Sequence, residues 1–140
     1  MITDSACIFC KIVAGDIPCF KLWEDERTLA FMDINPANPG HALAIAKNHA
    51  PDIFSLPPAD LAAAAATAQR VALALRAVLA PAGINLVQAN GPAAAQSVPH
   101  LHIHILPRRA DDGLALNWEP IPGDMAAIGE LAARVRAAIV

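Results

Sequence analysis

Three of the chain's five histidines stand at alternate positions in one short segment, as His100, His102 and His104. Side chains alternate between the two faces of a β-strand, so a strand here places the three imidazoles on one face. A sheet gains little from burying three polar rings, because each then needs a hydrogen-bond partner. The spacing therefore predicts a chemical site in a cleft. The residues between the histidines are apolar and can pack against a core: Leu101, Ile103 and Ile105.

Two kinds of chemistry use such a histidine face. Alternate histidines on a strand can bind zinc. Alternatively, a neutral imidazole can attack phosphorus and form a phosphohistidine that water cleaves, while its neighbours orient the nucleophile and bind phosphate oxygens. Ser97, just before the strand, is placed to help the leaving group take a proton, and the small residues of 90–95 let the backbone approach a phosphate closely. Because the metal interpretation gives these features no role, the sequence favours phosphorus chemistry.

A second group of reactive side chains lies near the N-terminus, where Cys7 and Cys10 are three positions apart. Two thiols at this spacing can supply half of a tetrahedral zinc site, with His49 and His100 as candidates for the other half. Two small buried hydrophobes or a redox pair remain alternatives, although the redox motif needs a preceding strand for which there is little room. The sequence places Cys19 in the core.

Three further polar residues are open to two interpretations. Asp33 ends an expected strand beside Asn35-Pro36, where its side chain can bond its own backbone in a turn or bind a pair of ligand hydroxyls. The residues alone favour the turn. His41 opens the next expected strand and His49 follows its end, and for both a structural role and a ligand role are equally open.

The elements that must position these residues follow from hydrophobic patterning. Strands are expected over residues 20–24, 28–33, 41–47 and 84–89 and along the triad, and helices from about 59 to 80 and from about 124 to 139. Strands and helices are segregated rather than alternating, which indicates an α+β fold with a largely antiparallel sheet. The long helix is apolar nearly all round, so one side should pack on the sheet and the other on a second subunit. The sequence thus predicts a homodimer.

Composition narrows the functional class. With 140 residues the chain is expected to form one domain, and its formal net charge of −3 with scattered Lys and Arg argues against a nucleic-acid surface. No secretory signal is visible, and the apolar stretch 61–80 is interrupted by Gln69, Arg70 and Arg76, so no membrane span is expected. Three cysteines make no disulfide framework. A cytoplasmic location fits best.

The triad and its flanks resemble the histidine triad (HIT) family. The family signature is His-φ-His-φ-His-φ-φ, with φ an apolar residue, and residues 100–106 match it as His-Leu-His-Ile-His-Ile-Leu. The resemblance covers residues 7–109 in register and is greatest to the Hint-like bacterial branch. Further matches lie upstream, at residues 7–12, 17–18, 29–34 with Pro36, 40–41 and 96–98.

This resemblance implies a fold and an activity. Members of the branch are nucleotide-binding hydrolases of the phosphoramidase type and nucleotidyl transferases. The chain is then expected to be a single HIT domain over 1–140, with the motifs in 7–109 and a C-terminal helical segment in 110–140. The implied fold is a five-stranded antiparallel sheet with one long helix and a C-terminal helix, paired into a dimer whose sheets run continuously. A purine nucleotide of the AMP or GMP type is the implied ligand.

The resemblance also implies residue roles. His102 is the implied nucleophile on the α-phosphate, the backbone carbonyl of His100 orients it, and His104 contacts the phosphate. Ser97 and Gln96 lie by the leaving group and phosphate. The implied role of Asp33 is to bind the ribose hydroxyls, which differs from the turn that the residues alone favour. The implied nucleotide-binding residues are Ile8, Phe9, Ile12, Ile17, Phe31, Asp33, His41, Asn90, Gln96, Ser97 and His104, and the implied structural zinc ligands are Cys7, Cys10, His49 and His100.

The sequence departs from the family pattern at three places. Ala89 stands where relatives usually carry Asn or Gln, with Gln88 and Asn90 beside it, so a phosphate contact is expected to be lost or shifted. Ala95 replaces a usual glycine, which predicts a stiffer loop. No match extends beyond Arg109. A dinucleoside polyphosphate hydrolase, a nucleotide- or partner-binding protein with little turnover, and a histidine-metal enzyme of unrelated fold are the rival interpretations.

Overall fold

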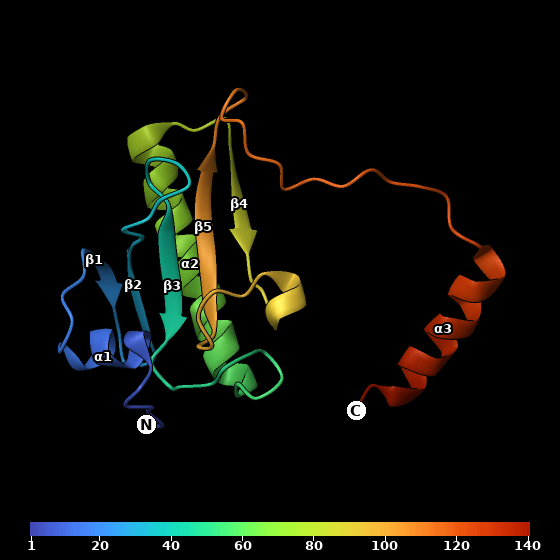
Figure 1. The fold of residues 1–140 in the computed structure, drawn as a ribbon, viewed down its shortest axis with the longest axis horizontal. Coiled ribbons are helices and arrows are strands. Elements are labelled where there is room, and N and C mark those ends of the chain that lie inside the picture. Colours follow the sequence, from blue (N-terminus) through green and yellow to red (C-terminus); the bar gives the residue numbers. More distant parts are fainter.

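The computed structural model describes residues 1–140, and its centre is a five-stranded antiparallel sheet in the order β1-β2-β3-β5-β4 (Figure 1). The expected α+β fold is thereby confirmed. Helix α2 lies along one face of the sheet, α1 lies on the other, and α3 stands apart from the body. The elements are α1 (Ile8–Ala14), β1 (Lys21–Glu24), β2 (Thr28–Met32), β3 (Ala42–Ala46), α2 (Pro58–Leu79), β4 (Gly83–Val87), a 3-10 turn η1 (Pro92–Ala94), β5 (His102–Arg108) and α3 (Met125–Ala138).

Small side chains bring α2 close to the sheet. Ala64 and Ala68 of α2 are fully buried, and they face a sheet surface that is itself rich in alanine. Alanine on both sides lets helix and sheet approach closely, although other alanines of α2 lie on its exposed side. Thr28 and Thr67 join the two layers through a buried hydrogen bond of 2.7 Å between their hydroxyls. The sheet residues of this cluster are Ala30, Ala42, Ala44, Ala46, Leu101, Ile103 and Ile105.

The opposite face of the sheet packs on α1. Phe9 and Cys10 of this helix are buried against Leu29, Phe31, Leu43 and Ile45. Helix α1 ends at Gly15, whose φ of 84° is the left-handed conformation that glycine adopts without steric cost. The two faces of β5 divide as expected, because its isoleucines join the α2 layer and its histidines lie on the α1 side.

Several boundaries differ from those predicted. Helix α1 was not expected, and the triad strand begins at His102, so His100 precedes it. The long helix and the C-terminal helix are present within one or two residues of their predicted ends. Two alanines adopt left-handed backbone: Ala80 caps α2 with φ 44°, and Ala95 follows η1 with φ 60°. The second is the position at which the family usually carries glycine, and alanine takes the same conformation there.

Helix α2 is buried on one side only within this chain. Leu73, Val78 and Leu79 remain exposed on it, so the predicted second contact is not made within one chain. By length and composition alone α2 is apolar enough to cross a membrane, but the core helix of a soluble protein meets the same criterion. Its buried alanines face the sheet. The exposed side of α2 is thus a surface without a partner in this chain.

Candidate active site and metal cluster

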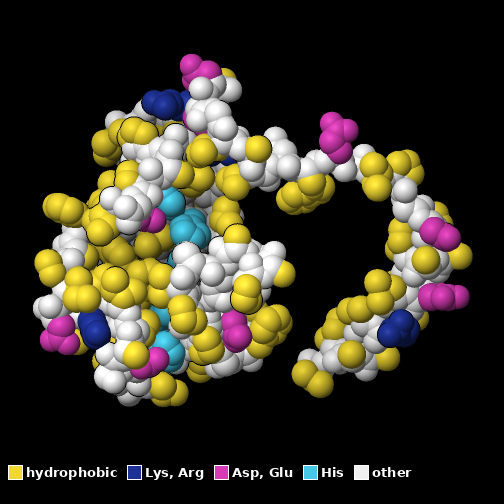
Figure 2. Space-filling model, viewed as in Figure 1, with side chains coloured by type: hydrophobic (Ala, Val, Ile, Leu, Met, Phe, Trp, Pro, Cys, Tyr) yellow, Lys and Arg dark blue, Asp and Glu magenta, His cyan; other side chains and the backbone are white.

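Strand pairing fixes where the last two triad histidines point. His102 lies opposite Ile45 and His104 opposite Leu43 in the antiparallel register of β5 and β3. Opposite residues in such a pair point to the same face, so both imidazoles lie on the α1 side of the sheet. Their ring centroids are 4.8 Å apart. In Figure 2, histidine side chains are visible in the middle of the body between hydrophobic ones.

Both imidazoles line a cavity of about 510 Å³. One side of the cavity is apolar and comes from α1 and β2, with Phe9 meeting the His102 ring edge-on at a centroid distance of 5.2 Å. The volume suits a small organic ligand. Nine of the residues expected to bind nucleotide line it: Ile8, Phe9, Ile12, Ile17, Phe31, Asp33, His41, Ser97 and His104.

A backbone carbonyl fixes the tautomer of His102. Its Nδ1 lies 2.7 Å from the carbonyl oxygen of His100, and because a carbonyl can only accept, Nδ1 carries the proton. The lone pair of the neutral ring is then on Nε2. Burial lowers the pKa of His102, which is 4 % exposed, so the ring is neutral at pH 7. The cavity is therefore lined by an unprotonated ring nitrogen, which is the form of imidazole that can attack an electrophile.

A second chain of hydrogen bonds fixes the tautomer of His104. The backbone N–H of Ala37 donates to Nδ1 of His41 at 3.0 Å, so the proton of neutral His41 is on Nε2. That nitrogen lies 2.9 Å from Nδ1 of His104 and donates to it. The proton of His104 is therefore on its own Nε2. His102 and His104 are thus opposite tautomers, the first with an acceptor and the second with a donor at Nε2.

The carboxylate of Asp33 combines both of the roles considered from the sequence. Its Oδ1 accepts a hydrogen bond of 2.8 Å from the backbone N–H of Asn35, which is the expected turn. Its Oδ2 lies 3.7 Å from Nε2 of His41, and the residue also lines the cavity. One oxygen is thus committed to the turn. The other is free to accept a hydrogen bond from a ligand.

Protonation of His104 should make the fold sensitive to acid. Burial, followed by repulsion from His102 and His41, lowers the pKa of His104 to about 4. An unfolded histidine titrates near pH 6.5, so below this pH the unfolded state takes up a proton that the folded state does not. Between pH 7 and pH 4 this residue should remove up to about 3 kcal/mol from the free energy of unfolding, with no effect above pH 7.

Urea unfolding of the wild type and of His104→Gln at the two pH values measures this contribution. The variant should lose about 3 kcal/mol less than the wild type on going from pH 7 to pH 4. Carboxylates titrate in both proteins, so their effect cancels in the comparison. An equal loss in both proteins would contradict the assignment.

The loop before the triad is held together by side chains that face away from the cavity. Gln96 accepts a hydrogen bond of 2.8 Å from the N–H of Gly91 and donates to the carbonyl of Val98 at 3.1 Å. Asn90 accepts from the N–H of Ile53 at 2.8 Å. Neither Gln96 nor Asn90 lines the cavity, although both were expected to bind nucleotide, and Ala89 does not line it either. Ser97 does, and it is the polar side chain that this loop contributes.

Some lining residues were not expected from the sequence. They contribute mostly apolar surface. Each lies next to a predicted residue along the chain or close to one, and this closeness in sequence could have identified them, whereas the alternation of side chains along a strand could not. Cys19, which was assigned to the core, is among them. The full set is Pro18, Cys19, Met32, Ile34, Asn35, Leu43 and Val98.

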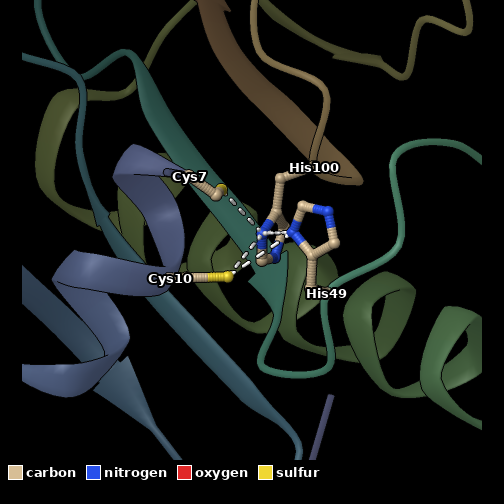
Figure 3. A group of neighbouring side chains, drawn as sticks. All are labelled: Cys7, Cys10, His49 and His100. Atoms are coloured by element: carbon tan, nitrogen blue, oxygen red, sulfur yellow. Dashed lines mark hydrogen bonds between the residues drawn. The ribbon is translucent and has the colours of Figure 1, made fainter. Parts of the chain in front are cut away.

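The first triad histidine belongs to a different cluster (Figure 3). The Nε2 of His100 donates to the carbonyl of Ala46 at 2.7 Å, which leaves the lone pair on Nδ1 facing Cys7 and Cys10. His49 turns its Nδ1 to the same point, while its Nε2 lies 3.8 Å from the carboxylate of Asp4. The ligand atoms of these two cysteines and two histidines all lie within 4.8 Å of one another.

The distances in this cluster fit a tetrahedral zinc ion. Zn–S bonds of about 2.3 Å and Zn–N bonds of about 2.05 Å place sulfur and nitrogen about 3.5 Å apart and the two nitrogens about 3.3 Å apart. The observed separations are 3.4 Å from Cys7 to His100, 3.4 Å from Cys10 to His49, 3.7 Å from Cys10 to His100, and 3.3 Å between the two Nδ1 atoms. The carbonyl of Ala46 behind the His100 ring also keeps the Nδ1 lone pair of His100 available to a metal ion.

Comparison with known proteins adds independent findings. The HIT domain family model matches residues 14–111. The adenosine 5′-monophosphoramidase hnt1 of Schizosaccharomyces pombe is 43% identical over 129 residues, which cover 89% of this chain and 94% of that protein. A crystal structure of a HIT family protein from Bacillus anthracis overlays with a TM-score of 0.92 at 36% identity, covering 99% of this chain and 100% of that one. A Zn-bound histidine triad family protein from Mycobacterium smegmatis overlays with a TM-score of 0.75 at 39% identity, covering 96% and 98%.

Proposed function

The chain belongs to the histidine triad (HIT) family, and on this premise we propose that it hydrolyses purine nucleotide phosphoramidates or related nucleotidyl esters through a nucleotidyl-His102 intermediate. The observation that carries the proposal is the pairing of tautomers in the cavity. His102 has its lone pair on Nε2 because the His100 carbonyl takes the Nδ1 proton, and His104 has its proton on Nε2 because His41 donates to Nδ1. An acceptor and a donor side by side suit nucleophilic attack on a phosphoryl group.

The reaction takes two steps. Nε2 of His102 attacks the α-phosphorus, a new P–N bond forms, and the bond from phosphorus to the amine of the leaving group breaks. The leaving amine takes a proton from solvent in this step, and we assign the relay of this proton to Ser97, whose side chain lines the cavity. The Nε2–H of His104 donates to a phosphate oxygen as charge develops there. Water then attacks the phosphorus, the bond to His102 breaks, and the nucleoside monophosphate leaves.

The remaining lining residues are proposed to bind the base and the ribose of the nucleotide. Apolar side chains of α1, of the segment after it and of β2 form the proposed slot for a purine, with Ile8, Phe9, Ile12, Ile17 and Phe31 around it. The free Oδ2 of Asp33 accepts hydrogen bonds from the ribose hydroxyls. This contact leaves the turn made by Oδ1 intact.

We further propose that Cys7, Cys10, His49 and His100 hold a structural zinc ion. Four protein ligands with no open position make such a site structural rather than catalytic. Bound zinc would hold α1 against the segment that begins the triad strand. His100 links the two sites, because its ring faces the metal cluster and its carbonyl sets the tautomer of His102.

We also propose that two copies of the chain form a homodimer. The exposed side of α2 and the unpaired edge of β4 both carry apolar residues, of which Leu73 is 60% and Leu86 52% exposed. Pairing of two β4 edges about a two-fold axis continues the sheet across both chains.

Phosphorus NMR of purified protein with adenosine 5′-monophosphoramidate tests the activity. The expected result is conversion to AMP with a higher kcat/KM than for a diadenosine polyphosphate under the same conditions. A preference for the dinucleotide would favour the polyphosphate hydrolase. Nucleotide binding without product from either compound would favour the binding protein and contradict the proposal.

A further inference from the structure

The loop that connects β2 to β3 joins two polar residues of the cavity. Asp33 opens this loop and His41 closes it, and both line the cavity. Residues 34–37 of the loop are exposed, whereas Asn38 is buried and only 6% exposed. A buried amide needs hydrogen-bond partners, so the partners of Asn38 show what holds the loop in place.

Both partners of the Asn38 side chain come from the end of β5 and the turn after it. Its Nδ2 donates to the carbonyl oxygen of Pro107 at 2.9 Å and to Oδ2 of Asp112 at 2.9 Å. The two hydrogens of the amide are thus both used. The loop and the end of β5 lie at the same end of the sheet (Figure 1). One side chain therefore fastens the loop to the far end of the triad strand.

Asp112 is a fixed acceptor for this contact. Its side chain is only 2% exposed, and Nε and Nη2 of Arg108 donate to its two oxygens at 2.7 and 3.0 Å. The backbone N–H groups of Leu114 and Arg109 donate to the same carboxylate, each at 3.0 Å. The Arg108 guanidinium and these N–H groups hold the pKa of Asp112 far below its usual range, so the carboxylate stays charged. Asn38 is thus bound to a rigid part of the fold.

The fastened loop contains the group that fixes the tautomer of His41. The carbonyl of Asn38 accepts from the N–H of His41 at 3.1 Å, and the N–H of Ala37 donates to Nδ1 of His41 at 3.0 Å. If Ala37 moved away, the proton of His41 would be free to occupy Nδ1, and Nε2 would then present a lone pair to Nδ1 of His104. Two lone pairs at the observed 2.9 Å repel, so His104 would move its own proton to Nδ1 and lose the donor at Nε2.

From these contacts we propose that Asn38 and Asp112 are positioning residues for the reaction at the cavity. They hold Ala37 against His41 and thereby keep the proton of His104 on Nε2. Neither Asn38 nor Asp112 lines the cavity, so they act through the two histidines and not on the substrate. The effect on catalysis rests on the function proposed above, but the tautomers exist in the free protein and are measured without substrate.

Nitrogen NMR of protein labelled with ¹⁵N-histidine measures the tautomers, because protonated and unprotonated ring nitrogens resonate far apart. At pH 7 both rings are neutral, since burial lowers the pKa of His41 and of His104. In the wild type both should carry the proton on Nε2. In Asn38→Ala both Nδ1 resonances should shift toward the protonated position and both Nε2 resonances toward the unprotonated one. A wild-type His41 protonated on Nδ1, or unchanged resonances in folded Asn38→Ala, would overturn the proposal.

Asn85→Ala is the matched control, and Asp112→Asn is a second test. Oδ1 of Asn85 accepts from Nη1 of Arg108 at 2.9 Å, and this side chain makes no hydrogen bond to the loop. Asn85→Ala should therefore leave the histidine resonances unchanged. Asp112→Asn keeps the size of the side chain but turns its NH₂ group toward other donors in either orientation, so it should shift the resonances as Asn38→Ala does. An equal shift in Asn85→Ala, or none in Asp112→Asn, would contradict the positioning role.

Steady-state kinetics with an adenosine phosphoramidate connect the tautomers with catalysis. Asn38→Ala should lower kcat about 10-fold and change KM less than about threefold, because the donor on His104 acts on charge that develops in the transition state. Asn85→Ala should keep the wild-type kcat. Shifted resonances with an unchanged kcat would overturn the positioning role. A wild type without turnover would instead contradict the proposed function, and the resonances alone would then decide whether Asn38 and Asp112 fix the tautomers.

Discussion

The variant His102→Ala is expected to lower kcat for an adenosine phosphoramidate by at least about 10⁴-fold, while nucleotide binding changes by a few fold only. The ring of His102 supplies the only bond that the protein is proposed to form with phosphorus, and its tautomer is fixed by a hydrogen bond of 2.7 Å to the His100 carbonyl. The purine slot and Asp33 lie elsewhere in the cavity and survive the substitution. Single-turnover kinetics and isothermal titration with AMP measure the two quantities.

The matched control is His104→Gln in the same cavity. Its amide can still donate to a phosphate oxygen, so the loss of kcat should be smaller, about 10- to 100-fold. Equal losses for both variants would show that His102 has no special role. Activity retained in His102→Ala would place the nucleophile elsewhere.

The variant Cys7→Ser is expected to lose zinc and to lower the free energy of unfolding by several kcal/mol. A structural metal contributes its binding free energy to folding, and Sγ of Cys7 lies 3.4 Å from Nδ1 of His100 in the cluster. The kcat should fall less than in His102→Ala, because the nucleophile remains while the segment that orients it loosens. Metal analysis by mass spectrometry and urea unfolding measure the two effects.

Cys19 provides the control for this prediction. It is also a free cysteine, but it lies outside the metal cluster, so Cys19→Ser should keep its zinc. Zinc that is retained in Cys7→Ser and lost in His102→Ala would assign the metal to the triad. That result would contradict both the structural zinc site and the proposed phosphorus mechanism.

Most of the elements around the candidate site were predicted from the sequence, with helix α1 as the exception. Alternation of histidine with Leu101, Ile103 and Ile105 placed the two faces of β5 correctly, because period-two alternation is a local property of a strand. The four residues of the metal cluster were also grouped correctly in space, since the family resemblance carries that long-range information. Helix α1 was missed, because seven residues are too few for helical periodicity to appear.

Other features depend on contacts that no local pattern records. The 2.9 Å contact between His41 and His104 joins residues 63 positions apart, and it determines where the proton of His104 lies. The His100 ring stays on the α1 side, where Phe9 meets it edge-on at 5.7 Å, but it faces Cys7 and Cys10 rather than the cavity. Gln96 and Asn90 turn to the backbone of their own loop and of residues 51–53, where unsatisfied amides and carbonyls compete with any ligand for them.

The covalent intermediate on His102 is tested most directly by intact-protein mass spectrometry after rapid mixing with an adenosine phosphoramidate and quenching in alkaline denaturant, because acid cleaves a bond between phosphorus and imidazole nitrogen. The account predicts a transient species heavier by one AMP less water, which peptide mapping assigns to His102. The species should be absent from His102→Ala and present in Cys19→Ser. Full turnover by the wild type with no such adduct at any quench time, or an adduct that persists in His102→Ala, would contradict the account.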